Sequence, residues 1–528
     1  MKDRKPKRDP LLSGPYDLAV VGGGINGAAL ARDAGLRGKS VVLLEKDDLG
    51  EGTSSRSSKM IHGGIRYLEG LHFGLVYESL RERHYLLHLA SHLVQPQTFV
   101  LPVYTGAPHG VRMTQLGLFL YDKLAWGRRP GKCQSLSVKE ILERVPTLEP
   151  SGLQGGGLYY DGVMNDARLV LANVLAALEE SRSVVVRNHM EVREVRGGSP
   201  CSLRLADGVT GAETSILAHR VVRALGPWSE PDRLVPSKGA HVVIPALPTP
   251  DGLLLTHSKD GRVFFVIPWQ GRTVVGTTET LHEGPPDNLR VEASEVSYLL
   301  DELRRVLPGL GVTNRDILGT FAGIRPLARQ DGFLARRSPG AVSRNHKVVD
   351  EGNGVVSVFG GKYTTYRAVA KDVLDRVFPG TACITHQKVL PGAEAGPWEE
   401  YRRRLPAGLN GHDPREVERL FRRYGCRLGE VLRLIDEDPT LAEPLAPDVP
   451  ETRAEVVHAA RTELAVYPED FLVRRTTLRY SAGGGRSAYD VIEQLLSEHG
   501  VGPPPDLAAA RARYIAELEH EDELRGVR

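Results

Sequence analysis

Three glycines near the N-terminus have the spacing of a dinucleotide-binding loop. Gly22, Gly24 and Gly27 fit the GxGxxG pattern, in which the first glycine allows a tight turn, the second lets the backbone approach a pyrophosphate and the third permits close helix packing. The pattern is specific only between a strand and a helix, because the diphosphate then lies at the positive end of the helix. The apolar run 16–21 before the loop and the small-residue run 28–36 after it provide that context.

A carboxylate and a hydroxyl-rich segment follow the loop. The apolar run 41–44 ends at Glu45, about 20 residues on, where a carboxylate can accept hydrogen bonds from a ribose diol and would repel a 2′-phosphate. The loop alone does not separate NAD from FAD. Residues 52–59, Gly-Thr-Ser-Ser-Arg-Ser-Ser-Lys, are dense in hydroxyls and could wrap the phosphates and ribityl hydroxyls of an extended FAD. Their composition also fits a flexible serine linker.

Four cations in distant segments could surround a phosphate dianion. Arginine is suited to this because its guanidinium makes bidentate contacts. The candidates are Arg66, which precedes Tyr67, and further along the chain Arg325, Arg344 and Lys362. The sequence does not show that they converge, and each cation could instead be solvated or structural.

Two further positions have chemistry to offer. Lys362 lies between the apolar strand 355–359 and a predicted helix, residues 364–377, whose positive end could stabilise negative charge on the N1–C2=O edge of a flavin. His241 begins an apolar strand, and its unperturbed pKa near 6.5 suits a general base. A lone histidine on a strand is as often structural.

The elements that must position these residues predict an α/β fold in three parts. Strand, glycine turn, helix and strand form a βαβ unit, and strand-like segments with turns fill much of the middle of the chain. After residues 390–392, Leu-Pro-Gly, charged helix-forming segments dominate. We therefore expect a discontinuous Rossmann-like FAD-binding domain, an α+β substrate cap with a mostly antiparallel sheet, and a helical C-terminal domain. The predicted ranges are a disordered basic tail (1–12), an oxidoreductase domain (13–390) with FAD-binding parts (about 13–100, 160–237 and 346–390) and a cap (about 238–345 plus part of 100–160), and the C-terminal domain (391–528).

Composition narrows the class of protein. The chain has 528 residues, enough for two to four domains, and its 41% hydrophobic and 25% charged residues are ordinary for a globular protein. A net charge of +2 gives no reason to expect nucleic acid. The four cysteines lie far apart without a CxxC pair, which predicts isolated reduced thiols and no metal site. We see no secretory signal and no apolar run of about 18 residues, so the expected location is cytoplasmic.

Together, these and later segments resemble the FAD-dependent, respiratory-type glycerol-3-phosphate dehydrogenases. The resemblance runs from about Tyr16 into the C-terminal domain. The glycine loop is generic, whereas the remaining set in this order is specific. The segments that carry it are 21–27, 53–55 with 58–59, 61–69, 166–170, 238–241, 265–269, 276–278, 323–327 and 359–367.

The resemblance implies a reaction and its residues. A hydride would leave C2 of sn-glycerol 3-phosphate for flavin N5, giving dihydroxyacetone phosphate, and electrons would pass to a membrane quinone. The substrate and phosphate region would be lined by Arg66, Tyr67, Arg325, Arg344 and Lys362. We expect His241 to be the base, with Arg325 or Lys362 assisting. The predicted cofactor-binding residues are Gly22, Gly24, Asn26, Gly27, Glu45, Thr53, Ser54, Ser58, Lys59, His62, Gly63, Gly226, Gly360, Gly361, Lys362 and Thr364.

One segment departs from the family pattern. The family usually has Ala-Thr-Gly-Pro-Trp on the strand before the cap, and this chain has Ala-Leu-Gly-Pro-Trp at residues 224–228. Leu225 cannot supply the threonine hydroxyl, but Gly226 still allows close approach of a flavin. We therefore expect FAD binding to survive, with the hydrogen bond of that hydroxyl either missing or made by another polar group.

Use of a quinone implies work at a membrane surface. Residues 116–129 are apolar and then basic, so they could lie in a lipid interface at the cytoplasmic face of the cell membrane; a buried helix with a polar end is the alternative. A homodimer is possible.

Three rival functions stay open. The first is a glycerol-3-phosphate oxidase using oxygen, which the lack of a long insertion argues against. The others are an amine or amino-acid oxidase of the same fold and a flavin-binding protein without catalysis.

Overall fold

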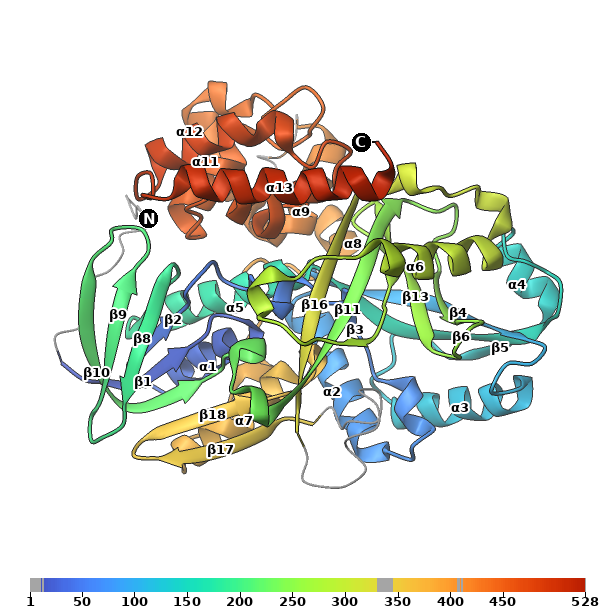
Figure 1. Cartoon of the computed structure of the whole chain (residues 1–528), viewed down its shortest axis with the longest axis horizontal. Coiled ribbons are helices and arrows are strands. Elements are labelled where there is room, and N and C mark those ends of the chain that lie inside the picture. The colour runs from blue at the N-terminus through green and yellow to red at the C-terminus, as the bar shows by residue number, and fades with distance from the viewer. Residues whose placement is uncertain (1–10, 12–13, 330–344, 406–408, 410–411, 528) are drawn as a thin grey trace.

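The computed structural model describes residues 11, 14–329, 345–405, 409 and 412–527. Nearly all of the predicted basic tail, and Arg344, lie outside the described residues. Two mixed β-sheets lie side by side, and the C-terminal helices gather across one side of both (Figure 1). The predicted fold class, an α/β protein with a helical C-terminal region, is confirmed.

The first sheet contains the predicted βαβ unit. Strands β18, β10, β1, β2 and β7 run parallel in that spatial order, with β17 antiparallel at one edge. The first part of β10 leaves this plane and pairs with β9, which pairs with β8. The strands described for this sheet are β1 (Tyr16–Val21), β2 (Val41–Leu44), β7 (Val184–Arg187), β8 (Met190–Arg196), β9 (Cys201–Asp207), β10 (Glu213–Arg223), β17 (Lys347–Gly352) and β18 (Val355–Phe359).

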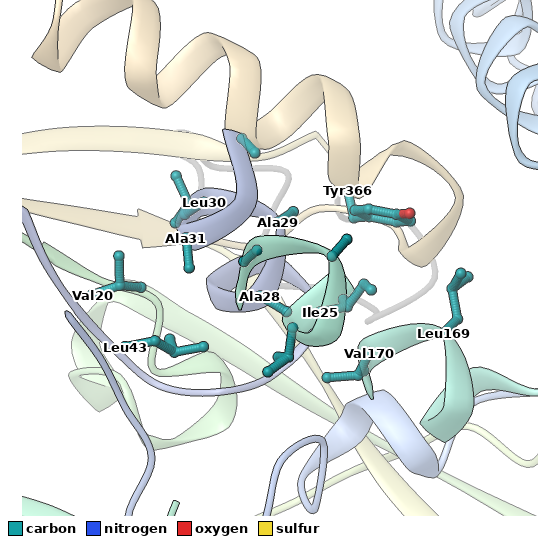
Figure 2. Close-up of a cluster of buried hydrophobic side chains, with 14 of the residues drawn as sticks. Val20, Ile25, Ala28, Ala29, Leu30, Ala31, Leu43, Leu169, Val170 and Tyr366 are labelled. Atoms are coloured by element: carbon teal, nitrogen blue, oxygen red, sulfur yellow. The ribbon is translucent and has the colours of Figure 1, made fainter. Parts of the chain in front are cut away.

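Apolar side chains cover both faces of the parallel strands. Because successive side chains on a strand alternate, Val20 and Leu43 face a helical layer, whereas Ala19 and Val42 face the β8–β9 side. The helical layer consists of α1 (Ile25–Leu36), α5 (Asp166–Glu180) and α7 (Tyr366–Val377). Small residues on α1, such as Ala28, let its neighbours pack closely, as Figure 2 shows. This packing fixes the start of α1 at the end of β1.

The second sheet is mostly antiparallel. Its path is β15-β11-β14-β13-β12-β4-β6-β3, with β16 beside β11 and β5 beside β6. Only the β12–β4 pairing is parallel among those described. The strands are β3 (Met60–Ile61), β4 (Val94–Tyr104), β5 (Gln134–Leu136), β6 (Leu153–Met164), β11 (Leu234–Pro245), β12 (Gly252–Thr256), β13 (Val263–Trp269), β14 (Arg272–Gly276), β15 (Thr280–Leu281) and β16 (Gly319–Ala328).

Helices cover this sheet and form the C-terminal region. Helices α2 and α3 lie together beneath the second sheet in Figure 1, whereas α6 overlaps the sheet in this view and contacts β11 and β14. The C-terminal helices share an apolar core of their own. The described helices not yet named are α2 (Phe73–Leu89), α3 (Val111–Leu124), α4 (Val138–Arg144), α6 (Ala293–Val306), α8 (Trp398–Arg402), α9 (Pro414–Tyr424), α10 (Leu428–Glu437), α11 (Arg453–Thr462), α12 (Tyr489–His499) and α13 (Leu507–Arg525).

Buried ion pairs join the C-terminal region to the rest. Asp48, just after β2, accepts hydrogen bonds from Arg474 and from Arg475, and all three side chains are buried. Arg168 of α5 pairs with Glu463 in the same way. Buried ion pairs therefore fix the position of the C-terminal region against the βαβ unit and α5.

Candidate active site

A cavity of about 1010 Å³ lies where the two sheets meet. Its walls come from the carboxyl end of β1, the start of α1, the segment 51–67 and the facing parts of β11 and β16. Cofactor and substrate sites have volumes of roughly 300–1,000 Å³. The cavity is thus large enough for a dinucleotide with a small molecule beside it.

The glycine loop brings bare backbone to one end of the cavity. Gly22 has φ +106°, and a Cβ there would lie 2.5 Å from the Ala224 carbonyl oxygen. A Cβ on Gly27 would lie 1.8 Å from the Gly22 carbonyl oxygen. Helix α1 starts after Gly24 without a side-chain cap, and the Ile25 N–H donates to Ser54 Oγ at 3.0 Å. Glycine is therefore required at these positions, and the positive end of α1 faces the cavity.

Glu45 closes the same end. Its Oε2 accepts a hydrogen bond from the Gly23 N–H at 2.5 Å, and its Oε1 accepts one from the Asp47 N–H at 3.0 Å. Burial raises the pKa of the Glu45 carboxyl to about 7. Since a carboxylate has about four lone-pair sites, acceptor capacity remains for the hydroxyls of a ribose.

These features fit the adenosine diphosphate half of FAD. Asn26 and Ser54 line the cavity beside the uncapped helix, and Gly226 lines it further along. Leu225, the departure from the family pattern, also lines the cavity and offers no hydroxyl. Thr53 lines it too, but its Oγ1 donates to the Ile324 carbonyl at 2.6 Å, so the hydroxyl hydrogen is already used.

Cationic side chains line the other end. Arg66 and Tyr67 follow a turn at Gly64, which has φ +77°. Lys362 follows two cavity-lining glycines with positive φ, Gly360 and Gly361. The Lys362 ammonium lies 3.9 Å from the centroid of the Tyr67 ring and donates to Ser79 Oγ at 3.2 Å.

Arg325 lines the cavity from β16. Its Nη2 donates to Thr277 Oγ1 at 2.9 Å, and its Nη1 donates to Ser237 Oγ at 3.4 Å. Ser237 lies opposite Arg325 in the β11–β16 pairing. These two hydrogen bonds hold the guanidinium in place. Arg325 is only partly buried and lines the cavity.

His241 lines the cavity from β11. Its Nε2 is 2.8 Å from Ser58 Oγ, and its ring stacks on Phe321 with centroids 4.6 Å apart. Burial, with added effects of Arg325 and Lys59, holds the pKa of His241 well below 6.5. The imidazole is therefore neutral at physiological pH.

The structure brings most of the expected site residues to this cavity, but not all of their side chains. Among the predicted residues, the cavity walls include Gly22, Gly24, Asn26, Glu45, Thr53, Ser54, Ser58, His62, Arg66, Tyr67, Gly226, His241, Arg325, Gly360, Gly361 and Lys362.

Four other predicted residues, Gly27, Lys59, Gly63 and Thr364, do not line the cavity. The Lys59 ammonium pairs instead with buried Asp166 at 2.8 Å. Gly27 packs directly against the Gly22 carbonyl. Gly63 and Thr364 take part in hydrogen bonds that hold the backbone at residues 62–63. The Gly63 N–H donates to Asp161 Oδ1, and Thr364 Oγ1 accepts from the His62 N–H at 3.1 Å. Arg344 lies outside the described residues.

Sequence reasoning missed several wall residues. Thr277, Arg262, Glu279 and Asn345 line the cavity through pairings that span long stretches of chain. Asp161 is the one with a sequence signal, because it is a charged residue inside the otherwise apolar and glycine-rich segment 153–164. A charge in a buried strand requires a partner, but the sequence does not name that partner.

Comparisons with known proteins agree with this geometry. The model of the FAD-dependent oxidoreductase family (DAO) matches residues 17–367, and that of the C-terminal domain of alpha-glycerophosphate oxidase matches residues 383–500. The chain is 35% identical over 519 residues to a glycerol-3-phosphate dehydrogenase from Synechocystis sp., covering 92% of this chain and 93% of that protein. It is 31% identical over 497 residues to the aerobic glycerol-3-phosphate dehydrogenase of Staphylococcus aureus (strain USA300), covering 88% and 87%.

Solved structures agree as well. The FAD complex of a glycerol-3-phosphate dehydrogenase from Bacillus halodurans matches with a TM-score of 0.77 and 27% identity, over 97% of this chain and 95% of that chain. A glycine oxidase from Geobacillus kaustophilus, 22% identical over 71% of this chain and 99% of that chain, shares the fold with a TM-score of 0.53. This chain therefore uses FAD and belongs to the FAD-dependent oxidoreductase family and, within it, to the glycerol-3-phosphate dehydrogenases.

Proposed function

We propose that this chain oxidises sn-glycerol 3-phosphate to dihydroxyacetone phosphate and passes the electrons to a membrane quinone. One observation carries the proposal: Arg66, Arg325 and Lys362, from three separate segments, line the same cavity as the dinucleotide loop. Such a cluster suits a phosphate dianion, whereas an amino acid would need only a carboxylate clamp. The names of the similar dehydrogenases support the same substrate.

The chain's own residues divide the work. Bound FAD supplies the acceptor for the hydride that leaves C2 of the substrate. Gly22, Gly24 and Glu45 would hold its adenosine diphosphate half, and Gly360 and Gly361 would let backbone approach its ring. Arg66, Arg325 and Lys362 would hold the phosphate and so orient C2.

His241 is the proposed base for the C2 hydroxyl proton. Its low pKa keeps the imidazole neutral, and Ser58 Oγ fixes the ring by its contact with Nε2. Positive charge on nearby Arg325 would stabilise negative charge that develops on the substrate oxygen as the proton leaves. Arg325 is therefore the proposed assistant to His241.

An apolar surface near the mouth of the cavity supports work at a membrane. Exposed side chains on α3 and just after it continue onto the start of α2, where Arg128 lies 5.0 Å from the centroid of the Tyr77 ring and links the two. Leu71 and Phe73 belong both to this surface and to the cavity wall. The exposed apolar residues of this docking surface are Leu71, Phe73, Tyr77, Met113, Leu116, Phe119 and Trp126.

Basic residues border the docking surface. Lys123 lies 4.9 Å from the centroid of the Trp126 ring, and Arg128 and Arg129 follow directly. Apolar groups between cations suit an interface with anionic lipid. No described helix is long and apolar enough to cross a membrane. We therefore propose peripheral binding at the cytoplasmic face, with the docking surface in the lipid headgroup region.

Anaerobic reduction tests the substrate. sn-Glycerol 3-phosphate should bleach the bound flavin, and glycine or sarcosine should not. Arg325→Ala should abolish bleaching while the protein stays yellow. Bleaching by the amino acids with none by the phosphate would overturn the proposed substrate.

A second pair of measurements tests the acceptor and the membrane. With substrate, the protein should reduce a soluble quinone analogue, and rapid peroxide release without quinone reduction would favour an oxidase. Phe119→Ser with Trp126→Ser should weaken flotation with anionic vesicles. Leu217→Ser, at an exposed apolar residue on β10, is the matched control and should float like wild type.

A further inference from the structure

A buried carboxylate forms part of the cavity wall beside the phosphate-binding end. Asp161 of β6 is 1% exposed, and its Oδ1 alone accepts three hydrogen bonds. The donors are the Gly63 N–H at 3.0 Å, the Tyr121 hydroxyl at 2.7 Å and Arg83 Nη1 at 2.7 Å. None of the roles assigned above uses this carboxylate.

The bond to Gly63 acts on the segment that carries Arg66 and Tyr67. A Cβ on Gly63 would lie 2.3 Å from Leu80 Cδ2 and 2.3 Å from the Tyr121 hydroxyl oxygen, so the backbone passes tightly between α2 and α3. The chain then turns at Gly64. The Gly63 N–H bond to Asp161 holds this point of the chain, next to the bond from the His62 N–H to Thr364 Oγ1.

Two helices hold the carboxylate in turn. Arg83, on α2, is 1% exposed and also donates to the Tyr160 carbonyl at 2.6 Å. Tyr121, on α3, is fully enclosed. A buried charge pair of this kind tolerates loss of one partner badly, because the other charge is then left unpaired. Donors from α2 and α3 therefore hold the carboxylate to which the Gly63 N–H bonds.

We propose that Asp161 is a positioning residue, which fixes the Gly63 amide and thereby sets Arg66 and Tyr67 for the substrate phosphate. The inference rests on the substrate proposed above. It assigns Asp161 no contact with the reacting atoms. Loss of the anchor therefore weakens substrate binding more than it slows the chemical step.

A single substitution of Asp161 would confuse anchoring with a stranded Arg83 charge, so the test uses two neutral pairs. Arg83→Met with Asp161→Asn removes both charges and keeps an oxygen that can accept from Gly63. Arg83→Met with Asp161→Leu removes both charges and that acceptor, with the same number of side-chain heavy atoms as aspartate. If the leucine pair does not fold, Arg83→Met with Asp161→Ala tests the same loss.

The two pairs should differ in KM. We expect the asparagine pair to stay within about threefold of wild type. The leucine pair should show a KM for sn-glycerol 3-phosphate raised about tenfold, which corresponds to about 1.4 kcal/mol of substrate binding, with kcat changed less and FAD content unchanged. Equal KM values in the two pairs would overturn the proposal.

Amide hydrogen exchange gives a readout that does not depend on the substrate. A peptide covering residues 62–68 should exchange faster in the leucine pair than in the asparagine pair. Equal exchange would overturn the anchoring role. If exchange differs but wild-type protein does not oxidise sn-glycerol 3-phosphate, the anchor stands and the proposed substrate fails.

Discussion

A methyl group placed beside Arg325 tests the phosphate clamp without removing any charge. Gly239 of β11 pairs with Gly323, two residues from Arg325, and so lies diagonally across the pair on the same face. A Cβ on Gly239 would lie 2.5 Å from Arg325 Nη2 and 2.5 Å from Thr277 Oγ1. Gly239→Ala must therefore displace both the guanidinium and the Thr277 side chain.

The size of the displacement sets the expected effect. Ordinary contact for a Cβ begins at 3.4 Å, so Arg325 Nη2 must retreat by about 0.9 Å. A misplacement of about 1 Å can cost up to about 10²-fold in rate. We expect kcat/KM for sn-glycerol 3-phosphate to fall about 10- to 100-fold, because the charge remains but no longer matches the phosphate. FAD content should not change, since the glycine loop and Glu45 are untouched.

Stopped-flow reduction of the bound flavin measures this directly. Substrate is mixed anaerobically with wild type, Gly239→Ala and Gly429→Ala, the last at a glycine of α10 with nothing within 4 Å of its added Cβ. The control should behave as wild type. If Gly239→Ala keeps wild-type substrate affinity and reduction rate, Arg325 does not clamp the phosphate.

Three further predictions follow from buried ionisable groups. His241→Asn should lower kcat by about 10²–10⁴-fold with FAD retained, and because the pKa of His241 lies well below 6.5, wild-type kcat measured from pH 6 to 8 should show no titration of this imidazole. Burial raises the pKa of the Glu45 carboxyl from 4.5 to about 7, so the folded apoprotein binds this proton more tightly than the unfolded chain does. The apoprotein should therefore lose stability as pH rises across this interval. Glu45→Gln should flatten that part of a plot of Tm against pH. Asp48→Ala leaves Arg474 and Arg475 without a shared buried carboxylate and should destabilise the protein by about 3–5 kcal/mol, which a lower Tm would show and an unchanged Tm would contradict.

Local pattern was sufficient to predict the βαβ unit. The apolar run 16–21, the glycine loop and the run 41–44 are adjacent in the chain, and the structure has β1, α1 and β2 there. The helix predicted at residues 364–377 contains α7, and the strand predicted at 355–359 is β18. In each case the signal lies within one element, where the hydrophobic period decides the outcome.

Residues held by distant partners could not be placed in this way. Lys59 sits in a hydroxyl-rich segment that suits a cofactor, but its ammonium pairs with Asp166, 107 positions further on. Residue type indicates that a buried lysine needs a carboxylate; it does not indicate which one. The same limit hid Thr277, which reaches Arg325 only because β11 brings β14 and β16 together.

Helix α2 shows why positioning is the harder part to predict. Its sequence is rich in charges and would suit a solvated helix, but Ser79 and Arg83, one turn apart, are both buried. Ser79 accepts a hydrogen bond from Lys362, and Arg83 holds the carboxylate that anchors Gly63. Because residues four apart share a face of a helix, one stripe of α2 contacts two separate parts of the phosphate-binding end. A substitution on that stripe should therefore alter substrate affinity without any contact between the changed residue and the substrate.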